Sequence, residues 1–367
     1  MGKPKWESWD AGELGAKLLS WYGSNRRDLP WRRSRDPYAI WVSEIMLQQT
    51  RVAAVVERYE AFMARFPTVA SLAQAPEQDV LALWSGLGYY RRARMLHRAA
   101  RFVAENLDGI LPASAEELRA LPGIGAYTAA AIASIAHGEP VAVVDGNVER
   151  VLCRLAGWEE SGRKGGAAQR RNIEGLAAHL LDGENASDFN QAVMELGAMV
   201  CTPRSPQCLV CPWSASCKTR GEHKTTPRPR MLSREVAHAL SVRMGPEPGT
   251  GASTREVLLE QRPASMTVMP GLWELPALKE AAVAAEDLRM TVRHAIMQVN
   301  YYVRIRTVFE DDVERLTAQG GERRWVALHE AAKMALTGLT RKVLSRARLL
   351  PSAPMDVIAG PKGSDVV

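Results

Sequence analysis

The sequence lacks the long apolar segments that membrane insertion and secretion require. Its 367 residues contain no run of 18 apolar side chains, and its first residues include no apolar stretch of the kind found in secretion signals. N-myristoylation of Gly2 requires a Ser or Thr four residues further on, and this chain has Trp6 there. We therefore expect a cytoplasmic protein with no signal peptide, no lipid anchor and no membrane span.

Fixed-period repeats are also absent, and cysteine is scarce. Four of the five cysteines, Cys201, Cys208, Cys211 and Cys217, fall within one short segment, whereas Cys153 stands in a helical apolar pattern that predicts a buried side chain. In a chain without a secretion signal, such clustering favours metal binding over disulfides. Zinc and a [4Fe–4S] cluster both accept four thiolates, and the spacing alone does not distinguish them.

Length and charge set broader limits. A chain of 367 residues favours two domains, and its formal net charge of +6 is compatible with a polyanionic partner. Apolar periodicity, with Pro or Gly in the connections, predicts an all-α domain over residues 1–224. The predicted helices are Glu13–Trp21, Ile40–Phe62, Val80–Trp84, Arg91–Asn106, Ala115–Leu121, Ala126–His137, Val148–Ala156, Asn172–Leu181 and Asp188–Val200.

A basic, Pro-containing linker at 225–231 precedes a change of pattern. Residues 232–350 combine alternating β-branched segments with short helical ones and predict an α+β domain. The tail 351–367 is rich in Pro, Gly and Ser and is expected to be disordered. The predicted strands are Val236–Met244, Val257–Gln261 and Val299–Val308, and the predicted helices are Leu328–Met334 and Leu339–Ala347.

The segment Leu121-Pro122-Gly123-Ile124-Gly125 puts two glycines before a predicted helix. Gly123 and Gly125 can both take φ > 0 and leave N–H groups uncovered at the positive end of that helix, which suits a DNA phosphate. An ordinary Gly-rich turn between two helices is the alternative. Further along the chain, Asp145 interrupts an apolar run.

The cysteine spacing resembles the iron–sulfur loop of the endonuclease III branch of the helix-hairpin-helix DNA glycosylases, and Leu121–Gly125 resembles their hairpin. The resemblance to the MutY-type adenine DNA glycosylases is more specific, and the blocks that carry it are Leu29–Arg32, Asp36–Tyr38, Trp41–Thr50, Trp84–Tyr90, Val144–Val148 and Phe189–Gly197. It implies a [4Fe–4S] cluster on the four clustered cysteines. It also implies removal of adenine mispaired with 8-oxoguanine or guanine in double-stranded DNA. We expect a monomer associated with the bacterial nucleoid.

The expected fold is multidomain: an all-α helix-hairpin-helix glycosylase domain with its iron–sulfur loop at 201–217, then an α+β Nudix-like domain. Pro270–Pro276 carries the likeness to Nudix proteins, but the following residues lack the paired glutamates that hold magnesium in Nudix hydrolases. We therefore expect a domain that reads the lesion strand. Family members carry Phe-Ser-His in the lesion loop, where this chain has Ile296-Met297-Gln298, so Met297 can wedge and Gln298 can hydrogen-bond.

Cleavage of an N-glycosidic bond requires a protonated leaving base and a stabilised sugar cation, and two carboxyl groups can divide these tasks. Glu44 lies among apolar residues, where desolvation should raise its pKa, and the resemblance makes it the acid that protonates adenine. Asp145 is expected to stay ionised and to stabilise or trap the sugar cation. For Glu44, a salt-bridged helix carboxylate is the alternative.

Tyr127 stands where the lyase members of the superfamily have a lysine. A phenol cannot form a Schiff base, so we expect a monofunctional glycosylase. Tyr127 is expected to pack near the sugar cation and to steady Asp145, with Asn147 as a second polar support of the site.

Base flipping requires side chains that fill the duplex and side chains that hold the extruded base. By resemblance, Gln49, Thr50 and Tyr89 fill or wedge the duplex, although Tyr89 could instead be a hydrophobic staple beneath its loop. The adenine pocket is expected to consist of Arg27, Trp31, Leu47 and Glu195. The basic side chains Arg91, Arg92, Arg94 and Arg98 face either phosphate or plain solvent.

Two other functions stay open at this point. An endonuclease III-like glycosylase/lyase would require an amine where Tyr127 stands. A non-catalytic iron–sulfur protein that binds DNA or senses redox state would require neither Glu44 nor Asp145, although the chain has both.

Overall fold

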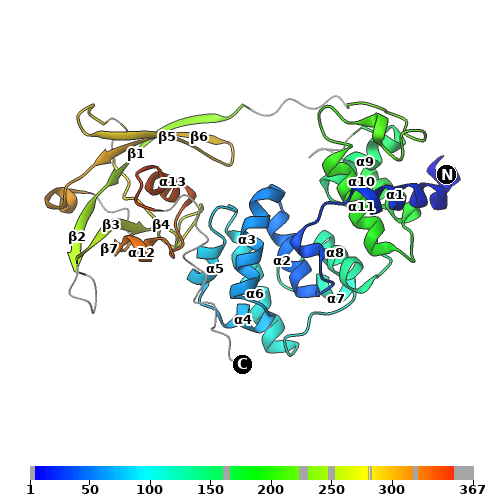
Figure 1. Ribbon diagram of the computed structural model, residues 1–367, viewed down its shortest axis with the longest axis horizontal. Helices are drawn as coiled ribbons and strands as arrows, with labels where there is room; N and C mark the ends of the chain where they lie inside the picture. The colour runs from blue at the N-terminus through cyan, green and yellow to red at the C-terminus, as the bar shows by residue number, and fades with distance from the viewer. Residues whose placement is uncertain are drawn as a thin grey trace. The chain divides into compact units, whose positions relative to one another are not determined.

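The computed structural model describes residues 5–159, 166–222, 230–246, 253–279, 281, 283–316 and 321–350. The chain forms two compact units, which are described separately here (Figure 1). The predicted order of an all-α region followed by an α+β region is confirmed. The first unit comprises Met1–Gln49, Thr68–Ala73 and Arg98–Thr226, and the second comprises Thr50–Pro67, Gln74–His97 and Pro227–Val367.

The first unit is helical, and its helices begin and end at recognisable caps. Asp10 and Asp36 each accept a backbone hydrogen bond at a helix start, while Gly138 and Gly157 end helices in the left-handed conformation. The helices are α1 (Ala11–Asn25), α2 (Pro37–Leu47), α4 (Val69–Gln74), the second half of α6 (Arg91–Asn106), α7 (Ala115–Arg119), α8 (Ala126–His137), α9 (Gly146–Ala156), α10 (Ala167–Leu180) and α11 (Ala186–Met199).

Two helices of this unit are buried on every side. In α2 all residues from Tyr38 to Met46 are buried, and in α8 all residues from Thr128 to Ile135 are buried. Helices that are apolar all round belong in an interior, and α2 and α8 pack against each other. The larger core lies between α1, α9, α10 and α11, with side chains such as Leu18, Leu176 and Leu196 fully enclosed.

The sequence predicted one helix from Ile40 to Phe62, and this prediction is wrong. α2 ends at Leu47, and α3 (Val52–Arg65) begins after an irregular segment in which Gln49 has φ 55°. No Gly or Pro marks this break in the sequence. It coincides with a tertiary contact, because the side-chain amide of Gln48 lies 3.4 Å from the Thr128 hydroxyl on α8.

The second unit joins helices from the N-terminal half to the C-terminal α+β region. α3 packs on α5 (Glu77–Leu83), and the rings of Phe62 and Trp84 meet edge to face at 6.0 Å. The first turns of α6 belong to the same unit, where the Tyr90 hydroxyl donates to the Leu336 carbonyl at 3.2 Å.

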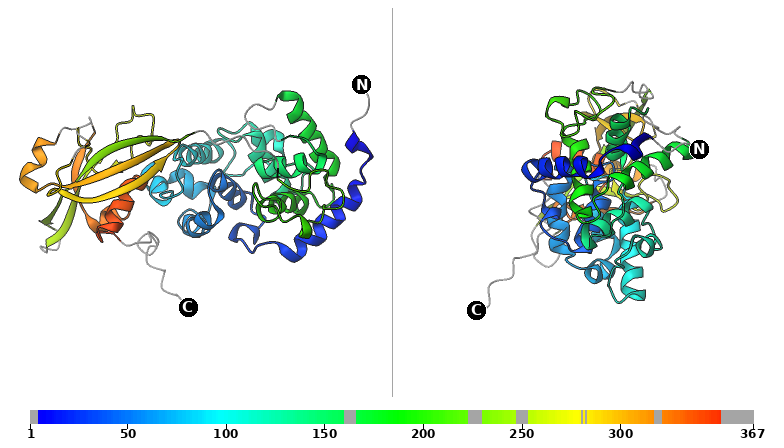
Figure 2. Two further views of the ribbon diagram at one scale, coloured as in Figure 1. Left: turned by 90° about the horizontal axis from the view of Figure 1, so that it is seen from above. Right: turned by 90° about the vertical axis from the view of Figure 1, so that its right-hand side faces the viewer.

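Two sheets form the C-terminal part of this unit (Figure 2). In the first sheet, β6 (Val299–Thr307) lies between β1 (Leu232–Leu240), which is parallel to it, and β5 (Leu288–Ile296), which is antiparallel. In the second, β3 (Ser253–Gln261) pairs antiparallel with β2 (Val242–Pro246), β4 (Trp273–Glu274) and β7 (Arg323–Ala327). Side chains of both sheets share a core with α12 (Leu328–Ala331) and α13 (Gly338–Arg346).

The predicted strand Val236–Met244 is in fact two strands. β1 ends at Leu240 and β2 begins at Val242, so the buried Ser241 marks the point where the chain passes from one sheet to the other. The predicted strands Val257–Gln261 and Val299–Val308 correspond to β3 and β6, whereas β5 and β7 were not predicted.

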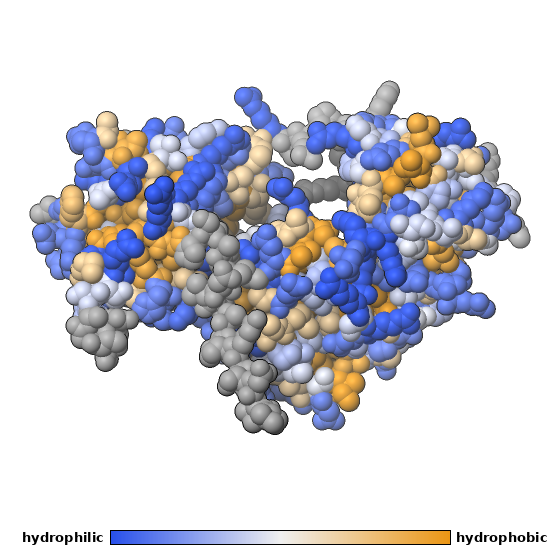
Figure 3. Space-filling view, in the orientation of Figure 1, coloured by the Kyte–Doolittle hydropathy of each residue, from blue (hydrophilic) through white to orange (hydrophobic). Residues whose placement is uncertain are grey.

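Parts of the predicted domain plan fall outside the described residues. They include residues 223–229, most of the predicted linker, and the tail 351–367. The boundaries at 224 and 232 therefore stay a prediction. None of the helices in the described ranges is long and apolar enough to cross a membrane, and the face drawn in Figure 3 mixes hydrophilic and apolar groups.

We predict that Gly197→Ala destabilises the chain whereas Gly15→Ala does not. A Cβ at Gly197 would lie 2.8 Å from the Asn147 Cβ and 3.1 Å from the Asn147 carbonyl oxygen, so α9 and α11 must separate, with a loss of about 1–3 kcal/mol. A Cβ at Gly15 in α1 would meet only the Phe189 ring, at 3.9 Å, and the helix should gain about 0.5–1 kcal/mol. Urea unfolding of both variants measures the difference, and equal stabilities would contradict the close approach.

Candidate functional site

The site is organised around a buried carboxyl group on α2. Glu44 is 6% exposed, and the hydroxyl of Tyr127 donates a hydrogen bond to its Oε2 atom at 2.6 Å. Tyr127 lies in the first turn of α8, so the packing of α8 on α2 brings the two side chains together. The Tyr127 hydroxyl also lies 3.7 Å from the sulfur of Met194 on α11.

The surroundings of Glu44 favour its protonated form. Burial raises its pKa to about 7, and the negative charge of Asp145 acts in the same direction. The hydrogen bond from Tyr127 and the positive charge of Arg32 oppose this rise. A carboxyl group with such a pKa can hold a proton at neutral pH and give it up, as a general acid requires.

The Tyr127 hydroxyl is suited to donating a hydrogen bond and not to acting as a base. Burial raises the pKa of its phenol well above the ordinary value, and the charges of Glu44 and Asp145 add to the shift. The hydroxyl therefore keeps its proton at neutral pH. It orients the carboxyl of Glu44 without exchanging protons with solvent.

Asp145 is the N-cap of α9. Its Oδ1 atom accepts hydrogen bonds from the backbone N–H groups of Asn147 at 2.9 Å and Val148 at 2.7 Å, and its Oδ2 atom accepts one from the Asn147 side-chain amide at 3.0 Å. These three hydrogen bonds fix the position and orientation of the Asp145 carboxyl group at the start of α9. Asp145 also lies within electrostatic range of Glu44.

The predicted adenine pocket contains a second buried carboxylate with different partners. Glu195 on α11 is 1% exposed and accepts hydrogen bonds from the guanidinium groups of Arg27, at 2.6 and 2.8 Å, and Arg32, at 2.9 and 3.0 Å. Although burial disfavours its charge, these bonds lower the pKa of Glu195 to about 2. Trp31 is buried beside Arg32, and Leu47 follows Glu44 by one turn of α2.

Sequence reasoning missed Arg32 and Met194. Arg32 was part of a quoted block but received no role, even though a buried glutamate such as Glu195 generally requires a cationic partner. Met194 directly precedes Glu195 in the chain, and nothing in its local pattern signals contact with Tyr127.

The two glycines of the hairpin adopt different conformations. Gly123 has φ 79°, as predicted, whereas Gly125 has φ −86° and ψ 172°, so the prediction of φ > 0 at Gly125 is wrong. Gly125 is the N-cap of α8, and an extended backbone is what that position requires. No side chain caps α8, and no heavy atom lies within 4 Å of a Cβ built on Gly125. The backbone at Gly125 therefore borders open space on its Cβ side.

The residues predicted to enter the duplex lie in irregular backbone. Gln49, in the first unit, is exposed and has φ 55°. Thr50, in the second unit, donates from its hydroxyl to the Leu87 carbonyl at 3.3 Å. Tyr89, in the same loop as Leu87, is 51% exposed and has φ 47°.

The predicted lesion loop is the turn between β5 and β6. Ile296 and Val299 pair across this hairpin, so Met297 and Gln298 are its two turn residues. Met297 is 74% exposed and has φ 54°, and the backbone carbonyl of Gln298 accepts a hydrogen bond from the Leu232 N–H at 2.9 Å.

The four predicted metal ligands line one small cavity. Burial raises the pKa of the Cys211 thiol to about 11, and the other three cysteines add to the shift, so all four lie within electrostatic range. Among the described residues, no group of three or more His, Cys, Asp or Glu side chains could hold a metal ion as placed. Four thiols around one cavity fit a [4Fe–4S] cluster, which would offer each thiolate its own iron. The four predicted ligands are Cys201, Cys208, Cys211 and Cys217.

Two buried arginines of α9 hold the start of the cysteine loop, and sequence reasoning missed both. Arg154 donates to the carbonyls of Thr202 at 2.6 Å and Pro203 at 3.0 Å. Arg150 donates to the Cys201 carbonyl at 2.8 Å and to the Asn147 side-chain oxygen at 2.9 Å. One helix therefore connects the residues around Asp145 to the cysteine loop.

Comparison with protein families agrees with this arrangement. The family described as HhH-GPD superfamily base excision DNA repair protein matches residues 42–176. The iron–sulfur binding domain of endonuclease III matches residues 201–217, a range that begins and ends at predicted ligands. This match confirms the predicted [4Fe–4S] cluster as the cofactor.

Curated relatives carry one common name, adenine DNA glycosylase. The human protein is 49% identical over 223 residues, which are 58% of this chain and 40% of the human one. The mouse protein is 39% identical over 317 residues, 73% of this chain and 61% of the relative. The protein of Mycolicibacterium smegmatis is 46% identical over 199 residues, 54% of this chain and 67% of the relative. The chain thus spans less than two thirds of the two mammalian proteins.

A solved structure, that of a thermostable thymine-DNA glycosylase, shares the fold of the helical region. Its TM-score is 0.51 at 30% identity, and the match covers 57% of this chain and 96% of the other. The family matches in the helical region and the iron–sulfur loop agree with the bacterial relative, of which this chain covers 67% at 46% identity. The chain therefore belongs to the MutY-type adenine DNA glycosylases.

Proposed function

We propose that the chain is a monofunctional DNA glycosylase of base excision repair that removes adenine mispaired with 8-oxoguanine or guanine. The proposal rests on the surroundings of Glu44. Its carboxyl group is buried, has a pKa of about 7, accepts a hydrogen bond from Tyr127 and lies within electrostatic range of Asp145. Glycosidic cleavage requires one carboxyl group that can protonate the leaving base and a second carboxyl group beside the sugar.

In the proposed reaction Glu44 gives its proton to the adenine ring. The bond between the base and C1′ of the deoxyribose then breaks, and both bonding electrons leave with the base. The carboxylate of Asp145, held by Asn147 and the start of α9, stabilises the resulting sugar cation or adds to it. Water completes the reaction at C1′, and the proton that it releases restores Glu44.

Tyr127 argues against a lyase reaction after the base has been released. A lyase of this superfamily uses a lysine amine at this position to attack the sugar, and Tyr127 offers only a phenol whose pKa is raised. Its role in the proposal is to orient the carboxyl of Glu44.

The adenine pocket of this proposal is shaped by a fixed ion cluster. Because Glu195 already accepts hydrogen bonds from Arg27 and Arg32, it acts by fixing these arginines more than by binding the base itself. Trp31 and Leu47 supply apolar faces for the adenine.

Double-stranded DNA is the proposed partner of a monomer that works at the nucleoid in the cytoplasm. The start of α8 at Gly125, which no side chain caps, suits a backbone phosphate, with Gly123 in the turn before it. The exposed Tyr89, with Gln49 and Thr50, suits entry into the duplex. When bound, the [4Fe–4S] cluster orders the loop of its four cysteines. Arg150 and Arg154 then fix that loop to α9.

We predict that Glu44→Gln and Asp145→Asn each slow adenine release at least about 100-fold, because each removes one of the two carboxyl functions. The measurement is single-turnover incubation with a duplex containing adenine opposite 8-oxoguanine, followed by alkali to nick the abasic site. Glu13→Gln is the matched control, since the Glu13 side chain is exposed on α1 and pairs with Lys17 on the same helix. A near-wild-type rate for either site variant would refute the assignment.

The raised pKa of Glu44 predicts a pH-dependent loss of stability. Between about pH 4.5 and 7 the folded chain keeps a proton that the unfolded chain has released, so the contribution of Glu44 to stability falls as pH rises and is lost above pH 7. Glu44→Gln carries no such charge. Relative to wild type, its free energy of unfolding should rise by up to about 3 kcal/mol from pH 5 to pH 8. Urea unfolding at four pH values tests this, and a difference that does not vary with pH would contradict it.

We predict that sodium borohydride traps no covalent complex between the wild-type chain and a duplex with adenine opposite 8-oxoguanine. Tyr127→Lys, which places an amine at this position, serves as the positive control for trapping. A high yield of adduct with the wild type, or strand nicks before alkali, would show that the chain is also a lyase.

A further inference from the structure

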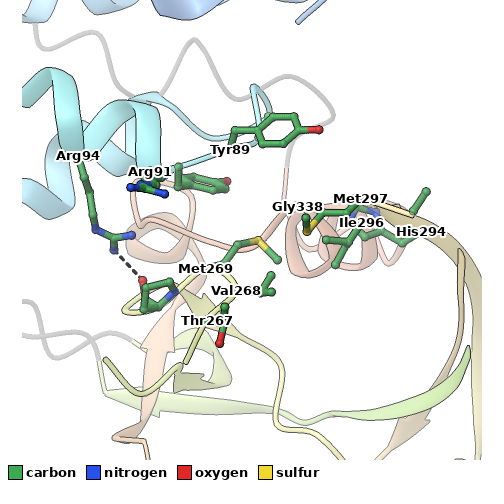
Figure 4. Close-up of a pocket in the computed structure, with 15 residues that line it drawn as sticks. Tyr89, Arg91, Arg94, Thr267, Val268, Met269, His294, Ile296, Met297 and Gly338 are labelled. Atoms are coloured by element: carbon green, nitrogen blue, oxygen red, sulfur yellow. Dashed lines mark hydrogen bonds between the residues drawn. The ribbon is translucent and has the colours of Figure 1, made fainter. Parts of the chain in front are cut away.

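The exposed Tyr89 is carried by the loop Ser85–Tyr90, which connects α5 to α6 in the second unit (Figure 4). Its side chain is 51% exposed, and its φ of 47° is uncommon for any residue other than glycine. A non-glycine residue keeps such a conformation only where neighbouring groups enforce it. The contacts beneath this loop therefore determine how Tyr89 is presented.

Two guanidinium groups meet at Ser85, the first residue of the loop, which is 2% exposed. The Nε atom of Arg58, on α3, donates to the Ser85 carbonyl at 2.8 Å, and the Nε atom of Arg341, on α13, donates to the Ser85 hydroxyl at 2.9 Å. The Nη2 atom of Arg341 also donates to the Met334 carbonyl at 3.2 Å, which fixes the guanidinium from its own side. A helix 256 residues further along the chain thus holds the start of the loop.

The other end of the loop is attached to the same region. The Tyr90 hydroxyl donates to the carbonyl of Leu336, a residue just before α13, at 3.2 Å. Burial raises the pKa of the Tyr90 phenol, and hydrogen bonds with the Ser85 side chain and the Gly86 backbone oppose this rise. Both ends of the loop are therefore fixed, and Tyr89 lies between them.

The absence of a side chain at Gly86 lets Arg58 approach the loop closely. Gly86 has φ 98°, and a Cβ atom there would lie 2.9 Å from the Nη2 atom of Arg58. A larger residue would have to displace this guanidinium or adopt a strained backbone. The sequence at the start of the loop is thus matched to a buried cation beneath it.

The two guanidinium groups are buried with little compensation. Burial lowers the pKa of both Arg58 and Arg341, and the charge of Arg58 acts on Arg341 in the same direction. The nearest acid of Arg58 is Glu57, at 3.6 Å, whose side chain is 72% exposed. Within the described ranges, no acidic side chain forms an ion pair with Arg341. Buried cations without a buried anion cost stability, and such groups are typical of functional sites.

We propose that Arg341 is a positioning residue for the extrusion of adenine: through Ser85 it holds the loop of Tyr89 in the conformation that enters the duplex. The inference rests on the proposed glycosylase function, in which Tyr89 enters the DNA as the adenine leaves the stack. A loop that is already fixed spends no binding energy on its own ordering. Arg341 therefore acts through the loop and not through a contact with the adenine.

The first test measures extrusion separately from catalysis. The full-length chain saturates a duplex that carries a non-hydrolysable 2′-fluoro adenosine opposite guanine, with the fluorescent base 2-aminopurine beside the adenosine. The fluorescence rises when the adenine leaves the stack. Arg341→Met and Ser85→Ala should each lower the equilibrium constant of extrusion about tenfold, as expected for the loss of one hydrogen bond to a charged group. Ser85→Ala leaves the bond between Arg341 and Met334 in place.

The variant with both substitutions should also lose about tenfold, because both changes remove the same bond. Arg346→Met, at an exposed arginine of α13, is the matched control for the loss of charge and should extrude adenine as the wild type does. Losses that add to about a hundredfold would overturn the proposal. A merely structural role of Arg341 would also overturn it, and would lower the urea midpoint of unfolding while extrusion by the folded, saturated variants stayed at the wild-type level.

The second test places 8-oxoguanine opposite the adenosine and measures release of an ordinary adenine in parallel. The loss of extrusion should be the same as opposite guanine, because Arg341 and Ser85 act on the loop and not on the opposite base. The single-turnover rate should fall by the same factor. A loss confined to 8-oxoguanine, or slower release with unchanged extrusion, would overturn the proposal. Failure of the proposed function would show differently, since the wild type itself would neither raise the fluorescence nor release adenine.

Discussion

The hydrogen bonds of the buried Arg150 guanidinium hold together the elements that position the proposed catalytic residue Asp145. It donates to the Asn147 side chain, to the Gly197 carbonyl at 2.7 Å and to the Cys201 carbonyl, and so joins α9, α11 and the cysteine loop. Loss of Arg150 would leave the buried Gly197 carbonyl without this donor, and a buried acceptor without a partner costs about 1–3 kcal/mol. Because Asn147 in turn holds Asp145, the position of the proposed catalytic anion depends on the packing around the iron–sulfur loop.

Helix α9 connects Asp145 to the cysteine loop. Asp145 caps its N-terminus, and its later turns direct Arg150 and Arg154 to the loop that contains Cys201. The cluster can therefore matter to the reaction without taking part in it. A cluster on the four cysteines would order the loop, whose carbonyls accept hydrogen bonds from Arg150 and Arg154, and Arg150 also joins α9 to the Gly197 carbonyl of α11. The close approach at Gly197 belongs to the same packing, since a side chain there would push Asn147 away.

The sequence predicted the parts of the site that form local patterns or family blocks, and it missed the contacts that join them. Glu44 was predicted to lie in an apolar setting, and the structure buries it. Arg32 and Glu195 pair across 163 residues, which no local pattern reveals. The break after Leu47 was missed because tertiary contact, not Gly or Pro, ends α2.

Glu44 and Glu195 show how one residue type can serve opposite purposes in one unit. Both are buried, yet the pKa of Glu44 is about 7 and that of Glu195 about 2. Two guanidinium groups compensate Glu195, whereas the phenol of Tyr127 gives Glu44 a hydrogen bond but no positive charge. A second arginine beside Glu44 would fix its negative charge and leave no proton to give. The absence of full compensation at Glu44 therefore suits the acid catalysis proposed for it, whereas the two arginines keep Glu195 charged.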